Sequence, residues 1–185
     1  CFGGMNLFAR SLGGIFSDFL FARFGFRGRI WAQFIALFFE AIFLFAFGCV
    51  SNDQEWYSAL MVLICFSLFV QMSEGTSYGI VPFMNKQQLA VVSALVGAGG
   101  NLGAVIAGKC FYAPIDDELL PFKIHAAYVM FWTLLSPVYW WPEHGGMFSG
   151  PSVVAEPAKV EDGPPEPAKV EENSAEPAQV EGNSI

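Results

Sequence analysis

Residues 30–50 read IWAQFIALFFEAIFLFAFGCV, an almost unbroken apolar run whose one charged residue is Glu40. A run of about 18 or more mostly apolar residues is long enough to cross a bilayer as a helix. Three further blocks follow, each with no more than one charge: residues 57–83, 89–113 and 124–141. Residues 1–21 carry two charges and form a weaker fifth candidate. The sequence therefore predicts an all-α membrane protein in which residues 1–141 form about five transmembrane helices.

The overall composition agrees with this class. Of the 185 residues, 54% are hydrophobic and 14% are charged, whereas about 25% are charged in a typical soluble domain. The net charge of −8 is concentrated at the C-terminal end, because residues 142–185 hold nine acids and two bases. Such an acidic segment argues against nucleic acid as a partner.

The C-terminal segment contains an internal repeat. EPAKVE occurs at residues 156–161 and again at 166–171, and EPAQVE follows at 176–181. A segment rich in Pro, Glu and Ala cannot bury enough apolar surface to fold. We therefore predict a disordered tail over residues 142–185, with a docking or regulatory role as the alternative.

The links between the apolar blocks alternate in charge, which predicts an orientation. The link at residues 20–29 contains Arg23, Arg27 and Arg29, whereas residues 51–56 contain two acids and no base. Basic links lie on the cytoplasmic side of a membrane. Four further spans return the chain to that side, so the tail is also expected in the cytoplasm.

Arg10 is a charged residue inside a predicted span, where arginine usually faces a water-filled cavity or a charged partner. Its planar guanidinium presents a fork of donors that matches planar oxyanions. Gly13 and Gly14 follow it and leave room for a ligand. In the alternative interpretation Arg10 pairs with a structural acid, either Asp18 or Glu74.

Glu40 and Glu74 are acids within predicted spans and have no base beside them in the sequence. Each is a candidate proton carrier, or else a protonated or hydrogen-bonded structural residue. Glu74 is the stronger candidate because it begins the polar run EGTSYGIVP at residues 74–82. Helices broken by Gly and Pro commonly line transporter sites.

Residues 97–104 read GAGGNLGA, an unusual density of small residues within a span. Gly99 and Gly103 form a spacing that favours close helix packing. That role does not call for Asn101, which supplies oriented hydrogen bonds beside a surface that a small substrate can approach.

Catalytic and metal-binding patterns are missing from the sequence. The four cysteines lie in or near apolar runs and form no C-x-x-C pair, and the two histidines are isolated. No nucleophile and base occur together in a recognisable motif. We therefore expect neither an enzyme nor a metal or cofactor site.

The residues Gly14, Asp18, Arg27 and Arg29 resemble the inter-span loop motif of the major facilitator superfamily, in which an acid at a helix end is followed by basic residues. This pattern implies charge pairing that locks neighbouring helices in one conformation. Phe19 departs from the motif, which usually has a basic residue at that position, and the loop is expected to be longer.

Five stretches occur in order: MNLFARSLGGIFSD (5–18), RFGFRGRIWA (23–32), FVQMSEGTSYGIVPF (69–83), SALVGAGGNLGAV (93–105) and HGGMFSGP (144–151). Together they resemble the nitrate/nitrite porter family of that superfamily, especially the high-affinity nitrate transporters of plants and algae. The resemblance covers residues 1 to about 151. It implies that the chain is the C-terminal part of a twelve-span bundle, from the eighth span to the twelfth.

The resemblance also implies where substrate binds. Arg10 matches the eighth-span arginine that binds nitrate in this family, and residues 97–104 match its second nitrate signature. The implied substrate-binding residues are Arg10, Tyr78, Gly99, Gly100, Asn101 and Gly103.

The implied function is proton-coupled nitrate uptake by alternating access. A nitrate/nitrite exchanger or a nitrite transporter is the alternative within transport. A membrane scaffold that recruits partners through its acidic tail is the alternative of another class.

The expected partners are nitrate or nitrite, protons, the lipid bilayer and the missing N-terminal half of the same protein. A small single-span accessory protein, as in some family members, is a further expected partner. The expected location is the plasma membrane.

Overall fold

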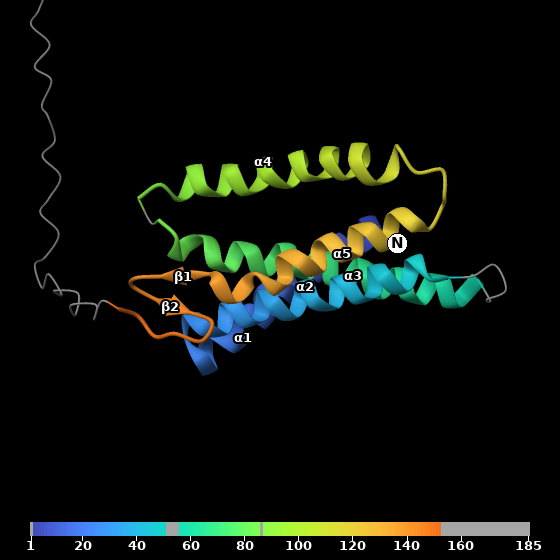
Figure 1. Ribbon diagram of the computed structural model, residues 1–185. Coiled ribbons are helices and arrows are strands. Elements are labelled where there is room, and N and C mark those ends of the chain that lie inside the picture. The colour runs from blue at the N-terminus through green and yellow to red at the C-terminus, as the bar shows by residue number, and fades with distance from the viewer. Residues whose placement is uncertain (1, 51–55, 86, 153–185) are drawn as a thin grey trace, which may run out of the picture. The chain divides into compact units, whose positions relative to one another are not determined.

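The computed structural model describes residues 2–50, 56–85 and 87–152. Its helices and strands, drawn in Figure 1, are α1 (Phe2–Phe24), α2 (Phe26–Gly48), α3 (Trp56–Ile80), α4 (Leu89–Ala107), α5 (Leu120–Leu134), β1 (Trp140–Trp141) and β2 (Gly145–Gly146). Three short helical turns follow α3, α4 and α5: η1 (Val81–Phe83), η2 (Gly108–Tyr112) and η3 (Ser136–Val138).

Three helices in the described part are long and apolar enough to cross a membrane: Phe26–Gly48, Trp56–Phe83 and Leu89–Tyr112. Helix α1 equals α2 in length, at 23 residues, but carries three charged residues. Helix α5 has 15 residues and reaches about 22 Å, less than the ~30 Å hydrocarbon core of a bilayer. The chain is an all-α membrane protein, and the count of five spans stays a prediction.

Helices α1, α2 and α3 pack against one another, and α5 packs against α2 (Figure 1). Glycines permit a close approach between α1 and α3. A Cβ atom at Gly13 would collide with the backbone of Met72, and one at Gly75 would collide with the carbonyl oxygen of Arg10. Small residues allow helix backbones to approach in this way within membranes. The expectation that Gly13 leaves room for a ligand is therefore wrong, because α3 fills that space.

The connection between α1 and α2 is the single residue Gly25, and the longer loop predicted at residues 20–29 is wrong. Gly25 has φ 64° and ψ −151°, a conformation that is essentially restricted to glycine. A Cβ atom at Gly28 would collide with the carbonyl oxygen of Leu20. The two helices thus touch directly after the turn, and Arg23 and Arg27 lie on helix ends.

Both ends of α5 have a local cause. At its start the Asp117 carboxylate accepts hydrogen bonds from the backbone N–H groups of Leu120 and Leu119, at 2.7 and 2.8 Å. These two bonds lower the pKa of the Asp117 carboxyl, and the bond from Leu120 has the larger effect. The helix ends at Leu134 because Pro137 lacks an N–H donor and disfavours a helical conformation in the residue before it.

The residues after α5 form a small hairpin. Trp140 pairs with Gly146 and Trp141 pairs with Gly145 in antiparallel register. The predicted helical span over residues 124–141 is therefore wrong at its C-terminal end. Proline at positions 137 and 142 separates these residues from any continuous helix.

The segment that follows packs onto the helices. Met147 is 2% exposed and joins Phe26, Ile30 and Ile80 in one buried cluster. The predicted start of the disordered tail at residue 142 is wrong, because this cluster draws the chain back onto α2 and α3. The EPAKVE-type repeats lie outside the described residues.

Helix α4 makes its main contacts with its own flanking turns, η1 and η2. None of the most apolar window of Leu89–Tyr112 is buried within the described structure. Leu95, Leu102 and Val105 are each more than half exposed. This surface is available to lipid or to other parts of a longer protein.

Candidate functional site

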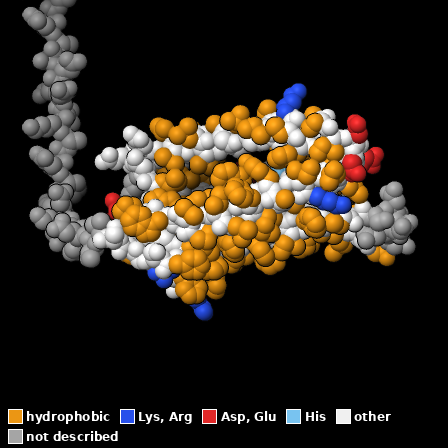
Figure 2. All heavy atoms as spheres, in the orientation of Figure 1, with side chains coloured by type: hydrophobic (Ala, Val, Ile, Leu, Met, Phe, Trp, Pro, Cys, Tyr) orange, Lys and Arg blue, Asp and Glu red, His pale blue; other side chains and the backbone are white. Residues whose placement is uncertain are grey.

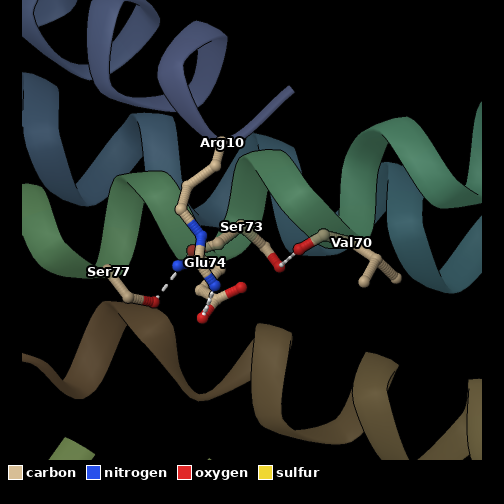
Figure 3. A network of polar contacts seen from close by, with 5 residues as sticks. All are labelled: Arg10, Val70, Ser73, Glu74 and Ser77. Atoms are coloured by element: carbon tan, nitrogen blue, oxygen red, sulfur yellow. Dashed lines mark hydrogen bonds and ion pairs between the residues drawn. The ribbon is translucent and has the colours of Figure 1, made fainter. Parts of the chain in front are cut away.

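Arg10 on α1 forms an ion pair with Glu74 on α3 (Figure 3). Both side chains are about half exposed, at 46% and 42%. In Figure 3 the hydroxyl of Ser77, one turn further along α3, points toward the same guanidinium. No base lies beside Glu74 in the sequence, and the fold supplies one from another helix. Arg10 therefore pairs with Glu74, whereas Asp18, the other candidate partner, pairs with Arg29.

Glu40 belongs to a separate polar contact. The hydroxyl of Ser73 lies 2.7 Å from the Glu40 carboxylate and 2.9 Å from the carbonyl oxygen of Val70, so two acceptors share its one hydrogen. The contact ties the middle of α2 to α3. Ser73 and Glu74 are neighbours in the chain, so Glu40 contacts α3 at the residue next to Glu74.

Gln33 on α2 holds the next part of α3. Its side-chain oxygen accepts hydrogen bonds from Thr76 at 2.6 Å and from Ser77 at 3.1 Å. Thr76 is fully buried, and a buried hydroxyl needs such a partner. The polar run that begins at Glu74 is therefore fixed by side chains from both α1 and α2.

A cavity of about 570 Å³ lies between α3 and α4. Its lining comes from one face of each helix: Glu74, Ser77 and Tyr78 on α3, and Val96, Gly97, Gly100 and Asn101 on α4. Residues three and four positions apart share a helix face, which explains both groups. Arg10 does not line the cavity itself and reaches its edge through the ion pair with Glu74.

The predicted site residues divide between this cavity and other places. Glu74, Tyr78, Gly100 and Asn101 line it. A Cβ atom at Gly99 or at Gly103 would meet no described atom within 4 Å. Gly103 lines a smaller cavity of about 260 Å³ toward α5 instead.

Three residues that line the cavity are not among the predicted site residues: Ser77, Val96 and Gly97. Val96 is apolar, whereas Ser77 and Gly97 lie in the two polar runs. Their signal was the spacing, because Ser77 lies three residues after Glu74 and Gly97 lies three and four before Gly100 and Asn101. Helical periodicity applied to the two polar runs selects these residues.

The loop motif contains a compact charged cluster. Arg29 pairs with Asp18 at 2.8 Å and donates a hydrogen bond to Ser17 at 3.2 Å. Its guanidinium also lies over the rings of Phe21 and Phe83, at 4.6 and 5.2 Å. Cation–π contacts of this kind help to hold the guanidinium in place beside Asp18. Arg29, at the start of α2, thus joins the C-terminal half of α1 to η1.

Gly14 and Arg27, the other two residues of the motif, lie outside this cluster. A Cβ atom at Gly14 would meet nothing within 4 Å. Arg27 is exposed and forms no ion pair with any carboxylate in the described part of the chain.

Comparison with known proteins shows which proteins the chain is similar to. The chain is 40% identical to Nitrate transporter 2.1 of Chlamydomonas reinhardtii over 161 residues, which cover 84% of this chain and 29% of that protein. It is 39% identical to High affinity nitrate transporter 2.5 of Arabidopsis thaliana over 153 residues, 82% of this chain and 30% of the relative. It is 32% identical to High-affinity nitrate transporter 2.3 of Oryza sativa subsp. japonica over 151 residues, 81% of this chain and 29% of the relative.

No family model and no solved structure gives a significant match to the chain. The chain spans about 30% of the length of the relatives named above. The similarity extends over most of the chain, since each of the three alignments covers more than four fifths of its residues. By this similarity the chain belongs to the nitrate/nitrite porter family.

Proposed function

We propose that the full-length protein carries nitrate across a membrane together with protons. The observation that carries the proposal is the Arg10 guanidinium, held by Glu74 at the edge of a cavity between two membrane helices. The relatives of the chain are named as nitrate transporters. Nitrate is a planar monoanion, and a guanidinium can bind it through two parallel hydrogen bonds.

The remaining lining suits a small anion in this proposal. Asn101 and Tyr78 offer side-chain donors from opposite sides of the cavity. Gly100 adds no side chain, so an anion can approach the backbone of α4. Gly99 and Gly103 are proposed to act on the same path once other segments of the full-length protein are in place.

The ion pair suggests how protons and nitrate are coupled. While Glu74 is charged, it occupies the guanidinium that nitrate needs. A proton on Glu74 removes that competitor, so nitrate binding and protonation favour each other. Glu40 is the second candidate carrier, although its contact is with Ser73 and not with a base.

The membrane potential assists nitrate entry only if more than one proton accompanies each nitrate. Moving one negative charge into a negative cell costs about 2.3 kcal/mol per 100 mV. One proton only cancels that charge, and a second makes entry favourable. The proposal therefore includes two protons per nitrate and a binding site that opens to each side of the membrane in turn.

The test is transport by the full-length protein in proteoliposomes. An inward proton gradient should drive nitrate uptake and should acidify the lumen in step with it. Chloride at the same concentration should not replace nitrate. Uptake that requires nitrite inside the vesicles and ignores the proton gradient would replace proton coupling with exchange.

We also propose a plasma-membrane location with the turn at Gly25 and the tail in the cytoplasm, because the turn carries Arg23 and Arg27. Cysteine labelling at position 53, which lies outside the described residues, should succeed only from the external side. Labelling from the cytoplasm alone would invert this topology.

A further inference from the structure

A second cavity, of about 520 Å³, lies at the turn between α1 and α2. Its lining is apolar except for one charged residue and includes Leu20, Phe24, Trp31, Ile35, Phe148 and the charged Arg27. Phe24 and Phe148 are 64% and 67% exposed, so the cavity is open to its surroundings. It lies apart from the cavity beside Glu74, and the proposed transport function makes no use of it.

The lining of the cavity changes from charged to apolar along α2. Arg27, Trp31 and Ile35 are four residues apart and therefore share one helix face. From Arg27 to Ile35 the helix rises about 12 Å. Positive charge thus stands at the start of a membrane-spanning helix, tryptophan follows at the depth typical of a membrane interface, and aliphatic surface lies deeper.

Arg27 differs from the other arginines near the turn. Arg29 forms an ion pair with Asp18, and Arg23 lies over the ring of Phe19 at 5.7 Å. Arg27 pairs with no described carboxylate, although it sits at the mouth of an apolar cavity. Figure 2 shows basic side chains projecting at this end of α1 and α2 beside a broad field of hydrophobic side chains.

We propose that this cavity binds one anionic phospholipid. The phosphate pairs with the Arg27 guanidinium, and an acyl chain lies along Trp31 and Ile35. Charge complementarity and direction select this occupant. A soluble anion would leave the apolar part of the cavity unfilled, and the cationic choline of a zwitterionic lipid would offset the attraction between its phosphate and Arg27. Basic pockets between transmembrane helices bind anionic head groups in this manner.

The experiment is native mass spectrometry of the full-length protein in detergent, titrated with phosphatidylglycerol or with phosphatidylcholine of the same acyl chains. The wild type should retain phosphatidylglycerol in preference. Arg27→Gln should weaken that binding about fivefold, the effect of one basic residue at a membrane surface. Lys109→Gln removes one positive charge from an exposed residue outside the cavity and should change the binding less than twofold.

Ile35→Trp keeps the charge and fills the deep end of the cavity, so it should also reduce phosphatidylglycerol binding. This variant decides the question if Arg27→Gln does not fold. Equal retention of both lipids by the wild type would overturn the proposal. Equal losses in Arg27→Gln and Lys109→Gln would do so as well, as would normal binding by Ile35→Trp.

Discussion

The guanidinium of Arg10 and the carboxylate of Glu74 form an ion pair that joins α1 to α3 at the edge of a cavity. An anion that enters this cavity meets an arginine that already has a partner. Binding at Arg10 must therefore compete with Glu74 or follow its neutralisation. The variants below separate the two residues' roles.

Arg10→Lys should fold and reach the membrane but bind nitrate about tenfold more weakly or worse. Lysine can keep a charge contact with Glu74, yet it lacks the planar fork, and one lost charge-assisted hydrogen bond accounts for a change of this size. The measurement is nitrate uptake by the full-length protein over a range of concentrations, normalised to surface amount. Near-normal affinity would remove Arg10 from the binding site.

Glu74→Gln should retain nitrate binding and lose accumulation driven by a proton gradient. Glutamine leaves Arg10 free for the anion but cannot carry a proton. Glu40→Gln tests the second candidate carrier, and it should leave the competition for Arg10 unchanged because Glu40 contacts Ser73 and not Arg10. Accumulation by Glu74→Gln at the wild-type level would show that protons travel by another group.

Gly13→Ala and Gly75→Ala should each destabilise the helix bundle by about 1–3 kcal/mol, the usual cost of overpacking. Each new methyl group would collide with the backbone of the facing helix. Gly14→Ala is the control, because nothing lies within 4 Å of its Cβ position. Thermal unfolding of the purified full-length protein is the readout, and equal midpoints for all three variants would contradict the close crossing.

Asn101→Ala should spare assembly and weaken nitrate binding, because the residue lines the cavity and has no packing role in the described structure. Gly99→Leu and Gly103→Leu should abolish transport by closing the packed or substrate-facing surface of α4. Binding assays on purified protein separate the two effects. If Asn101→Ala blocks membrane insertion and leaves affinity intact, the residue is structural.

A stop after Gly150 should leave the rate of transport per surface molecule unchanged, since it removes only residues after the Met147 cluster. Met147→Ala should instead lower the free energy of unfolding by about 2–5 kcal/mol, as for other large-to-small changes in a core. The two variants distinguish the packed hairpin from the repeats. A large loss of rate in the truncated protein would give the tail a part in the transport cycle.

Local sequence was sufficient for the class of fold. The apolar runs around Glu40, Glu74 and Lys109 correspond to three helices that can cross a membrane, because the length of an apolar run is a one-dimensional property. Helix ends were harder to predict. The turn at Gly25 and the end of α5 before Pro137 depend on backbone conformation at single residues, which hydropathy averages away.

The candidate site required the tertiary structure. Sequence alone marked Arg10, Glu74 and Asn101 as polar groups in apolar surroundings, because unpaired polar groups there are costly. Only the fold decided that Arg10 pairs with Glu74 and that Asn101 faces Tyr78 across a cavity, while Gly99 does not. The reason is that partners 64 residues apart meet through the crossing of α1 and α3, and that crossing depends on the backbone contacts permitted by Gly13 and Gly75.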